Sequence, residues 1–303
     1  MSSVGPPAQW RGGPPAAPAP RAMWWRCLLG GLALWVLALV VTYATQNTNL
    51  LPTLILLGSF LVPFCFALWA YEKERGLGLD VLLGCFVVGG VLGVLGASVL
   101  EYYLLHPSLW LFLGVGLIEE AVKAAALMFV LRRHREIRGL RAGLVLGAAV
   151  GFGFAAFESA GYAFNALFTL HGMSLRGLVE TEILRGLLAP FGHGLWTAIL
   201  GGALLADREA GRFRLTGRVV GTYVGVSVLH ALWDSVSGIA VWLVYVLTAS
   251  PQQHALFDRG YIPRPTGEQK HLYTLLSDGG LIVVALLGVA WLLSVSRGGS
   301  RRR

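Results

Sequence analysis

Four short polar clusters interrupt stretches of this chain that are otherwise apolar enough to span a membrane. An ionisable side chain in hydrocarbon costs several kcal/mol, so it is rare unless it is paired, lines a wet cavity or has a function. The clusters hold three glutamates, two histidines, a lysine and an aspartate, and they read GLIEEAVK (116–123), GFAAFESAGY (153–162), PFGHGLW (190–196) and VLHALWD (228–234). We therefore expect these side chains to meet in one buried polar site.

Such a set of side chains can hydrolyse a peptide bond in two ways. Two imidazoles and a carboxylate can hold a zinc ion with a position open for water, and Glu158, His193 and His230 suit this ligand role. A further carboxylate, Glu119 or Glu120, would then act as the general base when the metal-bound water attacks a carbonyl. The second scheme needs no metal, because a glutamate activates water directly while the histidines stabilise the oxyanion and protonate the leaving amine. The spacing does not choose between the two schemes.

Three further polar residues stand one helical turn after members of this set, namely Lys123, Tyr162 and Asp234. Residues three or four apart share a helix face, so we expect these side chains to support the ones that do chemistry. Lys123 can neutralise one carboxylate of the Glu pair, and Asp234 can accept a hydrogen bond from His230 or cap a break in the backbone. Each contact taken alone could be purely structural, so the case for chemistry rests on the whole set.

The composition predicts an all-α protein, a polytopic bundle of membrane helices. Of the 303 residues, 55% are hydrophobic and only 13% are charged, against about 25% charged in a soluble domain. Apolar runs of about 20 residues are long enough to cross a bilayer. We predict about eight such helices, over residues 24–45, 51–71, 79–100, 110–131, 142–170, 185–206, 219–249 and 272–295. The fifth and seventh exceed the need of the bilayer, so tilt, a break or an extramembrane turn is expected in each.

The distribution of basic residues predicts that both termini are cytoplasmic. With the N-terminus inside, 18 Lys and Arg residues fall on the cytoplasmic side and five on the other, with Lys123 left within the membrane. This asymmetry is the positive-inside pattern. The net charge of +8 therefore reflects topology and contacts with the lipid bilayer, and no nucleic-acid partner is expected because no aromatic and basic binding module accompanies it.

Three regions follow from these patterns. Residues 1–22 are rich in Pro, Ala and Gly and are predicted to form a disordered cytoplasmic arm. Residues 23–296 form the transmembrane domain, with the core motifs over 110–237, and residues 297–303 form a basic cytoplasmic tail.

The polar motifs resemble those of the PrsW family in content and order. EEAVK (119–123), FESAGY (157–162), FGHGLW (191–196) and HALWD (230–234) are similar to the family's Glu-Glu with Lys, Phe-Glu with a following Tyr, and two separated His segments. The similarity spans roughly residues 110–237, and the flanking helices fit only in hydropathy. It implies an intramembrane endopeptidase, generally classed as a metallopeptidase, with zinc as its metal. The family is distantly similar to the CAAX-type intramembrane proteases, which also use a double Glu and two His segments.

The resemblance also implies a substrate class and a membrane. The best-known role of the family is the first cut of a single-pass anti-sigma factor on its extracytoplasmic side, in a bacterial plasma (inner) membrane. With a rise of about 1.5 Å per residue along each helix, all four clusters are expected between the midplane and the outer third of the membrane. This depth suits such a cut. Activity on prenylated tails, as in the CAAX-type enzymes, fits less well because that site would open to the cytoplasm.

Two other classes of protein are compatible with buried ionisable groups. Glu, His and Lys inside a membrane also form ion pathways, so a transporter or proton-coupled carrier is the main alternative. Such folds often contain inverted repeats and broken helices, and the two halves of this chain show no convincing repeat. A non-catalytic scaffold is the third reading, and the intact polar set argues against it.

Overall fold

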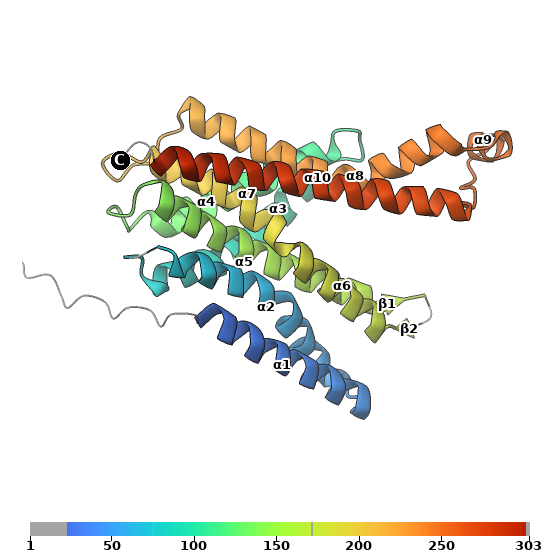
Figure 1. Ribbon diagram of the computed structural model, residues 1–303, viewed down its shortest axis with the longest axis horizontal. Coiled ribbons are helices and arrows are strands. Elements are labelled where there is room, and N and C mark those ends of the chain that lie inside the picture. The colour runs from blue at the N-terminus through green and yellow to red at the C-terminus, as the bar shows by residue number, and fades with distance from the viewer. Residues whose placement is uncertain (1–22, 75, 171, 301–303) are drawn as a thin grey trace, which may run out of the picture.

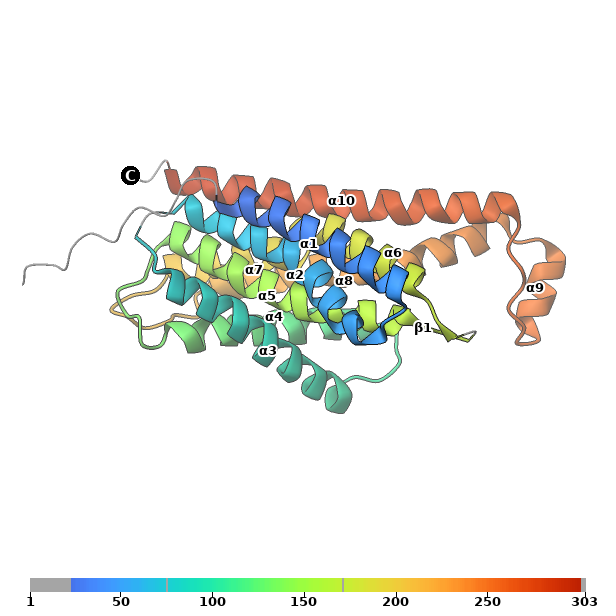
Figure 2. The same ribbon diagram turned by 90° about the horizontal axis from the view of Figure 1, so that it is seen from below.

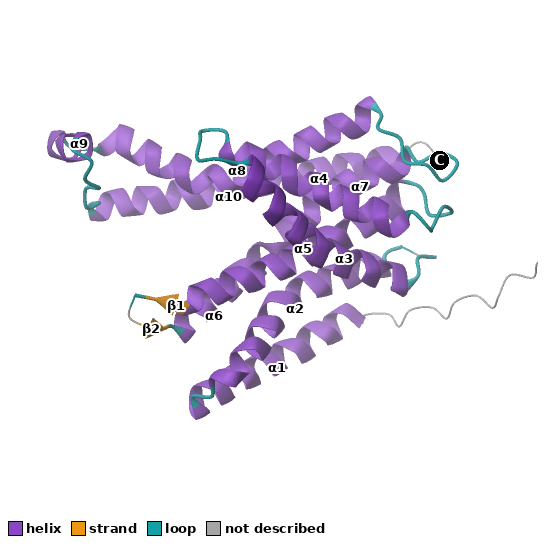
Figure 3. Cartoon of the chain, turned by 180° about the vertical axis from the view of Figure 1, so that it is seen from behind, coloured by secondary structure: helices purple, strands orange, loops and turns teal. Residues whose placement is uncertain are grey.

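The computed structural model describes residues 23–74, 76–170 and 172–300, and the arm predicted to be disordered, residues 1–22, lies outside them. The all-helical class is confirmed, and among these described residues the exception is one hairpin of two strands with two residues each (Figures 1 and 3). The elements are α1 (Met23–Thr45), η1 (Thr48–Leu50), α2 (Leu51–Glu72), α3 (Leu79–Leu104), α4 (Leu111–Leu131), α5 (Leu140–Leu167), β1 (Phe168–Thr169), β2 (Gly172–Met173), α6 (Leu175–Leu188), η2 (Ala189–Phe191), α7 (His193–Ala206), α8 (Gly217–Thr248), α9 (Pro251–Asp258) and α10 (Gly267–Ser300).

The chain is a multi-pass membrane protein. In the part that the structure describes, seven helical segments are long and apolar enough to cross a bilayer. The eighth predicted segment is α4, which has 21 residues but contains Glu119, Glu120 and Lys123. The start of α1 and the end of α10 lie toward the same end of the molecule, which is the arrangement that the predicted eight crossings would require (Figures 1 and 2). The side on which they lie stays a prediction.

The sixth predicted helix differs most from the structure. It begins at Leu175 rather than at residue 185, and it is divided by η2 into α6 and α7. The polar residues Arg176, Glu180 and Glu182 lower the hydropathy of α6. The first half of this helix is therefore not an apolar run, and hydropathy does not predict it. Pro190 in η2 has no N–H to continue the helical hydrogen bonds, so the chain turns before α7 begins at His193.

Helices α5 and α8, which correspond to the two predicted segments that exceed the need of the bilayer, are both unbroken. Helix α5 ends at Leu167, and the last predicted residues of that segment belong to the hairpin β1–β2 instead. Helix α8 continues for 32 residues without a turn. The extra length of both helices is therefore not taken up by a break.

Helix α5 is the centre of the bundle and touches α7 at backbone distance. Gly143, Gly147 and Gly151 recur every four residues along its face toward α7. A Cβ atom at Gly147 would overlap the carbonyl oxygen of Thr197, and one at Gly151 would overlap that of His193. Small residues at this spacing let membrane helices approach closely. The glycines therefore fix the height at which the start of α7 lies against α5.

A buried arginine joins the helix ends on the side opposite the hairpin. Arg208, in the loop after α7, donates hydrogen bonds to the carbonyl oxygens of Leu131, His134, Ile137 and Gly211. Burial lowers the pKa of the Arg208 guanidinium below its usual value. These bonds tie the end of α4 and the loop after it to the segment that follows α7.

Candidate active site

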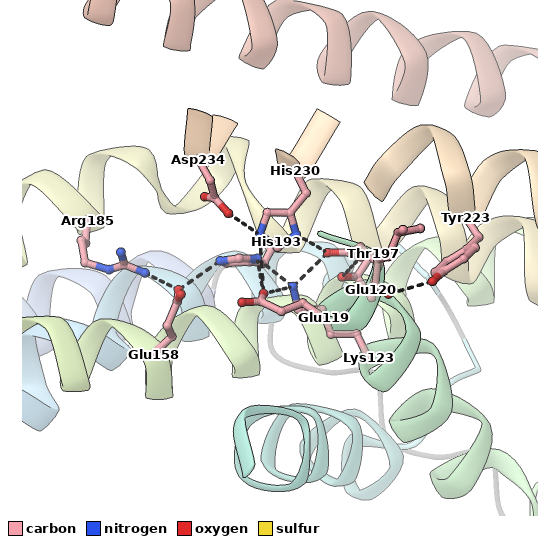
Figure 4. Close-up of polar contacts among 11 residues, drawn as sticks. Glu119, Glu120, Lys123, Glu158, Arg185, His193, Thr197, Tyr223, His230 and Asp234 are labelled. Atoms are coloured by element: carbon pink, nitrogen blue, oxygen red, sulfur yellow. Dashed lines mark hydrogen bonds and ion pairs between the residues drawn. The ribbon is translucent and has the colours of Figure 1, made fainter. Parts of the chain in front are cut away.

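The predicted polar residues converge between α4, α5, α7 and α8, as Figure 4 shows. Their contacts form one connected network of hydrogen bonds and ion pairs that contains Glu119, Glu120, Lys123, Glu158, His193, His230 and Asp234. Tyr162 lies at the edge of this network, half exposed, with its ring 4.2 Å from the guanidinium carbon of Arg185. We call the seven connected residues the Glu/His cluster.

Both histidines present one ring nitrogen to the same carboxylate oxygen. Oε2 of Glu119 lies 3.7 Å from Nδ1 of His193 and 3.5 Å from Nε2 of His230. Each of the three residues offers one ligand atom, and these atoms lie within 4.8 Å of one another. The two imidazole rings are 4.9 Å apart, centroid to centroid. Glu119, His193 and His230 are therefore a set of donors that could hold a metal ion.

The other nitrogen of each imidazole contacts a second carboxylate. Nε2 of His193 lies 3.1 Å from Oε2 of Glu158, and Nδ1 of His230 lies 3.2 Å from Oε1 of Glu120. Histidines that bind metals usually donate their other N–H to a carboxylate or carbonyl, which fixes the tautomer and the ring orientation. This cluster has that arrangement on both of its histidines.

Lys123 lies at the centre of the Glu/His cluster and is fully buried. Its Nζ is 2.9 Å from Oε2 of Glu119, 2.9 Å from Oε1 of Glu120 and 2.8 Å from Nδ1 of His193. It also lies 4.0 Å from the centre of the Phe154 ring. The expected pairing with one glutamate is thus a pairing with both, because Lys123 follows them by three and four residues on α4.

Arg185 is a member of the site that the sequence analysis missed. It donates from Nη2 to Oε2 of Glu158 at 2.5 Å and from Nε to Oγ of Ser159 at 2.7 Å. The prediction placed Arg185 at the outer end of the sixth helix, because the polar start of α6 did not resemble a membrane helix. Its position on α6 instead brings its charge to the carboxylate that orients His193.

Helix α7 supplies two further neighbours. Thr197 donates to Oε2 of Glu120 at 3.2 Å, and it follows His193 by four residues, a spacing that could have identified it. Trp196 is fully buried, and its ring centroid lies 4.8 Å from that of His230. Trp196 therefore forms a wall of the site, against the rings of both histidines.

The charges of the site favour a bound cation. With neutral imidazoles, the four carboxylates of the cluster exceed the two cations, Lys123 and Arg185, and leave a formal charge of −2. A divalent ion would neutralise this excess, and unpaired charge inside a membrane is costly. Two neutral nitrogens and one carboxylate oxygen are also the donors that zinc prefers. The residues therefore fit a metal ion, provided that Lys123 withdraws from Nδ1 of His193.

Comparison with known proteins agrees with this donor set. The family model described as PrsW family intramembrane metalloprotease matches residues 78–256. This region is more than half of the chain, and it contains α4 to α8 with the whole Glu/His cluster. No curated protein and no solved structure matches the chain. The chain belongs to the PrsW family of intramembrane metalloproteases.

Proposed function

We propose that this protein cleaves a single-pass membrane protein within or next to its membrane helix, at the Glu/His cluster. The observation that carries the proposal is the shared orientation of the two histidines. Each presents one nitrogen to Oε2 of Glu119, while Glu158 or Glu120 holds the other nitrogen. An ion pathway would not require two imidazoles fixed on a common point.

Glu119, His193 and His230 are the residues that would hold a zinc ion. A zinc ion bound there would lower the pKa of a bound water and polarise the substrate carbonyl. Glu158 and Glu120 would each fix one imidazole through its other nitrogen. The sequence suggested Glu158 as a ligand and Glu119 as a possible base. The contacts instead support Glu119 as the ligand and Glu158 as the carboxylate that orients His193.

Asp234 is the carboxylate best able to exchange protons with water and substrate. Its side chain is 28% exposed, whereas those of Glu119 and Glu120 are 8% and 0% exposed. Its Oδ2 lies 3.4 Å from Nε2 of His230, and Glu158, which is also partly exposed, is already bound by Arg185 and His193. Asp234 would take the proton of the attacking water and deliver it to the leaving amine, as a general base and then a general acid.

The substrate would approach from the side where α6 and α8 diverge. Glu158, Arg185 and Asp234, whose side chains are 22–28% exposed, lie on that side of it (Figure 4). Helices α8 and α10 separate from α5 and α6 toward the hairpin and α9 (Figure 3). A peptide entering there would meet Asp234 before the buried Glu119.

The position along α4 supports a cut on the extracytoplasmic side of a plasma (inner) membrane. Glu119 lies about 12 Å along the helix axis from Leu111. The opposite end of α4 leads into the basic loop over residues 132–139, which the positive-inside rule assigns to the cytoplasm. An anti-sigma factor, or another protein with one membrane helix and an outer domain, is a substrate of this class.

The proposal is tested by comparing protein N-termini in membranes from cells that carry the wild type, Glu119→Gln or Glu180→Gln. Glu180 is an exposed residue of α6 outside the cluster, so its variant controls for expression and insertion. We expect a new terminus in or just outside a single-pass helix with the wild type and Glu180→Gln, and its loss in Glu119→Gln. The same termini in all three membranes, at equal protein levels, would contradict the proposal.

A further inference from the structure

A second polar feature lies outside the Glu/His cluster, in a cavity between α1, α2 and α6. The cavity has a volume of about 550 Å³, which is within the range of small-molecule sites. Its walls are aromatic and aliphatic side chains, among them Trp24, Trp35 and Trp69. Among the described residues that line it, Glu182 on α6 is the one with a charged side chain. An apolar cavity that contains one carboxylate is a candidate binding site.

The Glu182 carboxylate is buried and only half satisfied. The residue is 4% exposed, and its Oε2 accepts a hydrogen bond from Nε1 of Trp35 at 2.8 Å. Its Oε1 has no hydrogen-bond partner within residues 23–74, 76–170 and 172–300. Leaving such a buried atom unpaired destabilises the protein. Oε1 is shielded from water in this structure, so a molecule in the cavity pairs with it once the carboxyl group turns toward the cavity.

The neighbouring helix accommodates this carboxylate. A Cβ atom at Gly58 of α2 would overlap the carboxylate group of Glu182. The glycine therefore provides the space that lets Glu182 lie between α2 and Trp35 of α1. The cavity extends along α2 from Gly58 to Trp69, about 16 Å along the helix axis. Its shape suits an elongated apolar molecule with one polar end.

The chemistry of Glu182 selects a hydroxyl as that polar end. A carboxylate needs a donor, and a protonated carboxyl also needs an acceptor for its own proton. A hydroxyl can donate and accept, whereas an ammonium only donates and an ester only accepts. A hydroxyl also brings no second charge into hydrocarbon. We propose that this cavity binds a neutral lipid alcohol whose hydroxyl group bonds to Oε1 of Glu182.

The cavity is separate from the Glu/His cluster but shares a helix with it. Arg185, which binds Glu158, follows Glu182 by three residues on α6. Pro190 lines the cavity and belongs to η2, directly before α7 and His193. The lipid site therefore adjoins the segment that positions two residues of the cluster. Its existence does not depend on proteolysis, and binding alone tests it.

Quenching of tryptophan fluorescence tests the site, because three tryptophans line it. The full chain in detergent micelles is titrated with 9,10-dibromo-octadecan-1-ol, and separately with methyl 9,10-dibromostearate and 9,10-dibromo-octadecylamine. The ester cannot donate a hydrogen bond to the carboxylate, so we expect half-maximal quenching by the alcohol at a concentration about tenfold lower than by the ester. The amine is expected to resemble the ester.

Two variants show whether the preference comes from this cavity. In Glu182→Leu, the alcohol and the ester are expected to quench the tryptophan fluorescence equally. In Glu180→Gln, which changes an exposed residue of the same helix, the wild-type preference for the alcohol is expected to remain. Gly186→Phe is an independent test that retains Glu182. Gly186 lines the cavity, and a Cβ atom there meets only Val62 within 4 Å, in ordinary contact, so the larger side chain is expected to fill part of the cavity. It is expected to remove the preference in a protein with unchanged helicity. Equal quenching by alcohol and ester in the wild type, a preference for the amine, or an alcohol preference that survives Gly186→Phe would overturn the proposal.

Discussion

Nζ of Lys123 lies 2.8 Å from Nδ1 of His193, on the side of the imidazole that faces Oε2 of Glu119. The ammonium thus contacts two of the three atoms that would bind a metal ion. Two cations at such a separation repel each other strongly in a medium of low dielectric constant. A metal ion and the present position of Lys123 therefore exclude each other. Metal binding requires Lys123 to move toward Glu120, whose Oε1 it already contacts.

Lys123→Met should strengthen metal binding and weaken the fold. The methionine fills a similar volume but no longer competes for His193, so we expect the affinity for zinc to rise about tenfold or more, equivalent to at least ~1.4 kcal/mol. Glu120 loses its buried counter-ion, so the free energy of unfolding without metal should fall by about 3–5 kcal/mol. Competition with a chromogenic chelator measures the first effect and thermal unfolding the second.

The exposed Lys270→Met is the matched control for both measurements, because it removes the same charge from the surface. Unchanged or weaker zinc binding by Lys123→Met, in a folded protein, would show that the lysine and the metal do not compete.

Asp234→Asn should separate catalysis from metal binding. Asparagine keeps the size of the side chain but cannot take a proton from water, so cleavage should fall by about 10²–10⁴-fold. Zinc content should stay at the wild-type level, since Asp234 contacts His230 at 3.4 Å but is not among the three converging donors. Single-turnover cleavage and metal analysis on the same preparation give both values. Loss of zinc together with activity would instead make Asp234 a ligand.

Gly151→Ala should displace His193 from its position in the site by moving the backbone of α7. The new methyl group would overlap the carbonyl oxygen of His193, so α7 must shift away from α5. We expect a loss of about 1–3 kcal/mol in stability and, because a shift of about 1 Å can cost 10²-fold in rate, a comparable loss of cleavage.

Gly161→Ala, in the same helix, is the control for this prediction. A Cβ atom at Gly161 has no heavy atom within 4 Å, so the variant should be as stable as the wild type or slightly more stable. Equal behaviour of Gly151→Ala and Gly161→Ala, in unfolding temperature and in cleavage, would mean that the α5–α7 contact does not position His193.

Much of the site could be predicted because charges stand out in apolar sequence. Glu119, Glu120 and Lys123 interrupt a run of membrane length, and His230 and Asp234 have the spacing of one helical turn. Their convergence followed from the cost of leaving such groups alone in hydrocarbon. The all-helical class and the boundaries of most helices followed from hydropathy in the same way.

The partners of these residues could not be predicted where the contact is long-range. Lys123 and His193 are 70 residues apart, and no local pattern shows that they touch. The contact of Arg185 with Glu158 was not predicted, because α6 is too polar to be recognised by hydropathy and the predicted helix began only at residue 185. In the fold, the polar residues Glu182 and Arg185 of α6 have hydrogen-bond partners. The different roles of Glu119 and Glu158 also depend on which ring nitrogen of His193 each carboxylate contacts. Spacing along the chain does not encode this contact.

The central claim is that Glu119, and not Glu158, completes the metal site with the two histidines. The most direct measurement is the zinc content of purified wild type, Glu119→Gln and Glu158→Gln, loaded with zinc, desalted and analysed by mass spectrometry alongside a titration of affinity. We predict about one zinc ion per chain in the wild type, almost none in Glu119→Gln, and binding about 10–100-fold weaker in Glu158→Gln, because Glu158 only orients His193. A wild-type protein that cleaves its substrate at full rate without bound metal, or a Glu119→Gln variant that retains zinc, would contradict the claim.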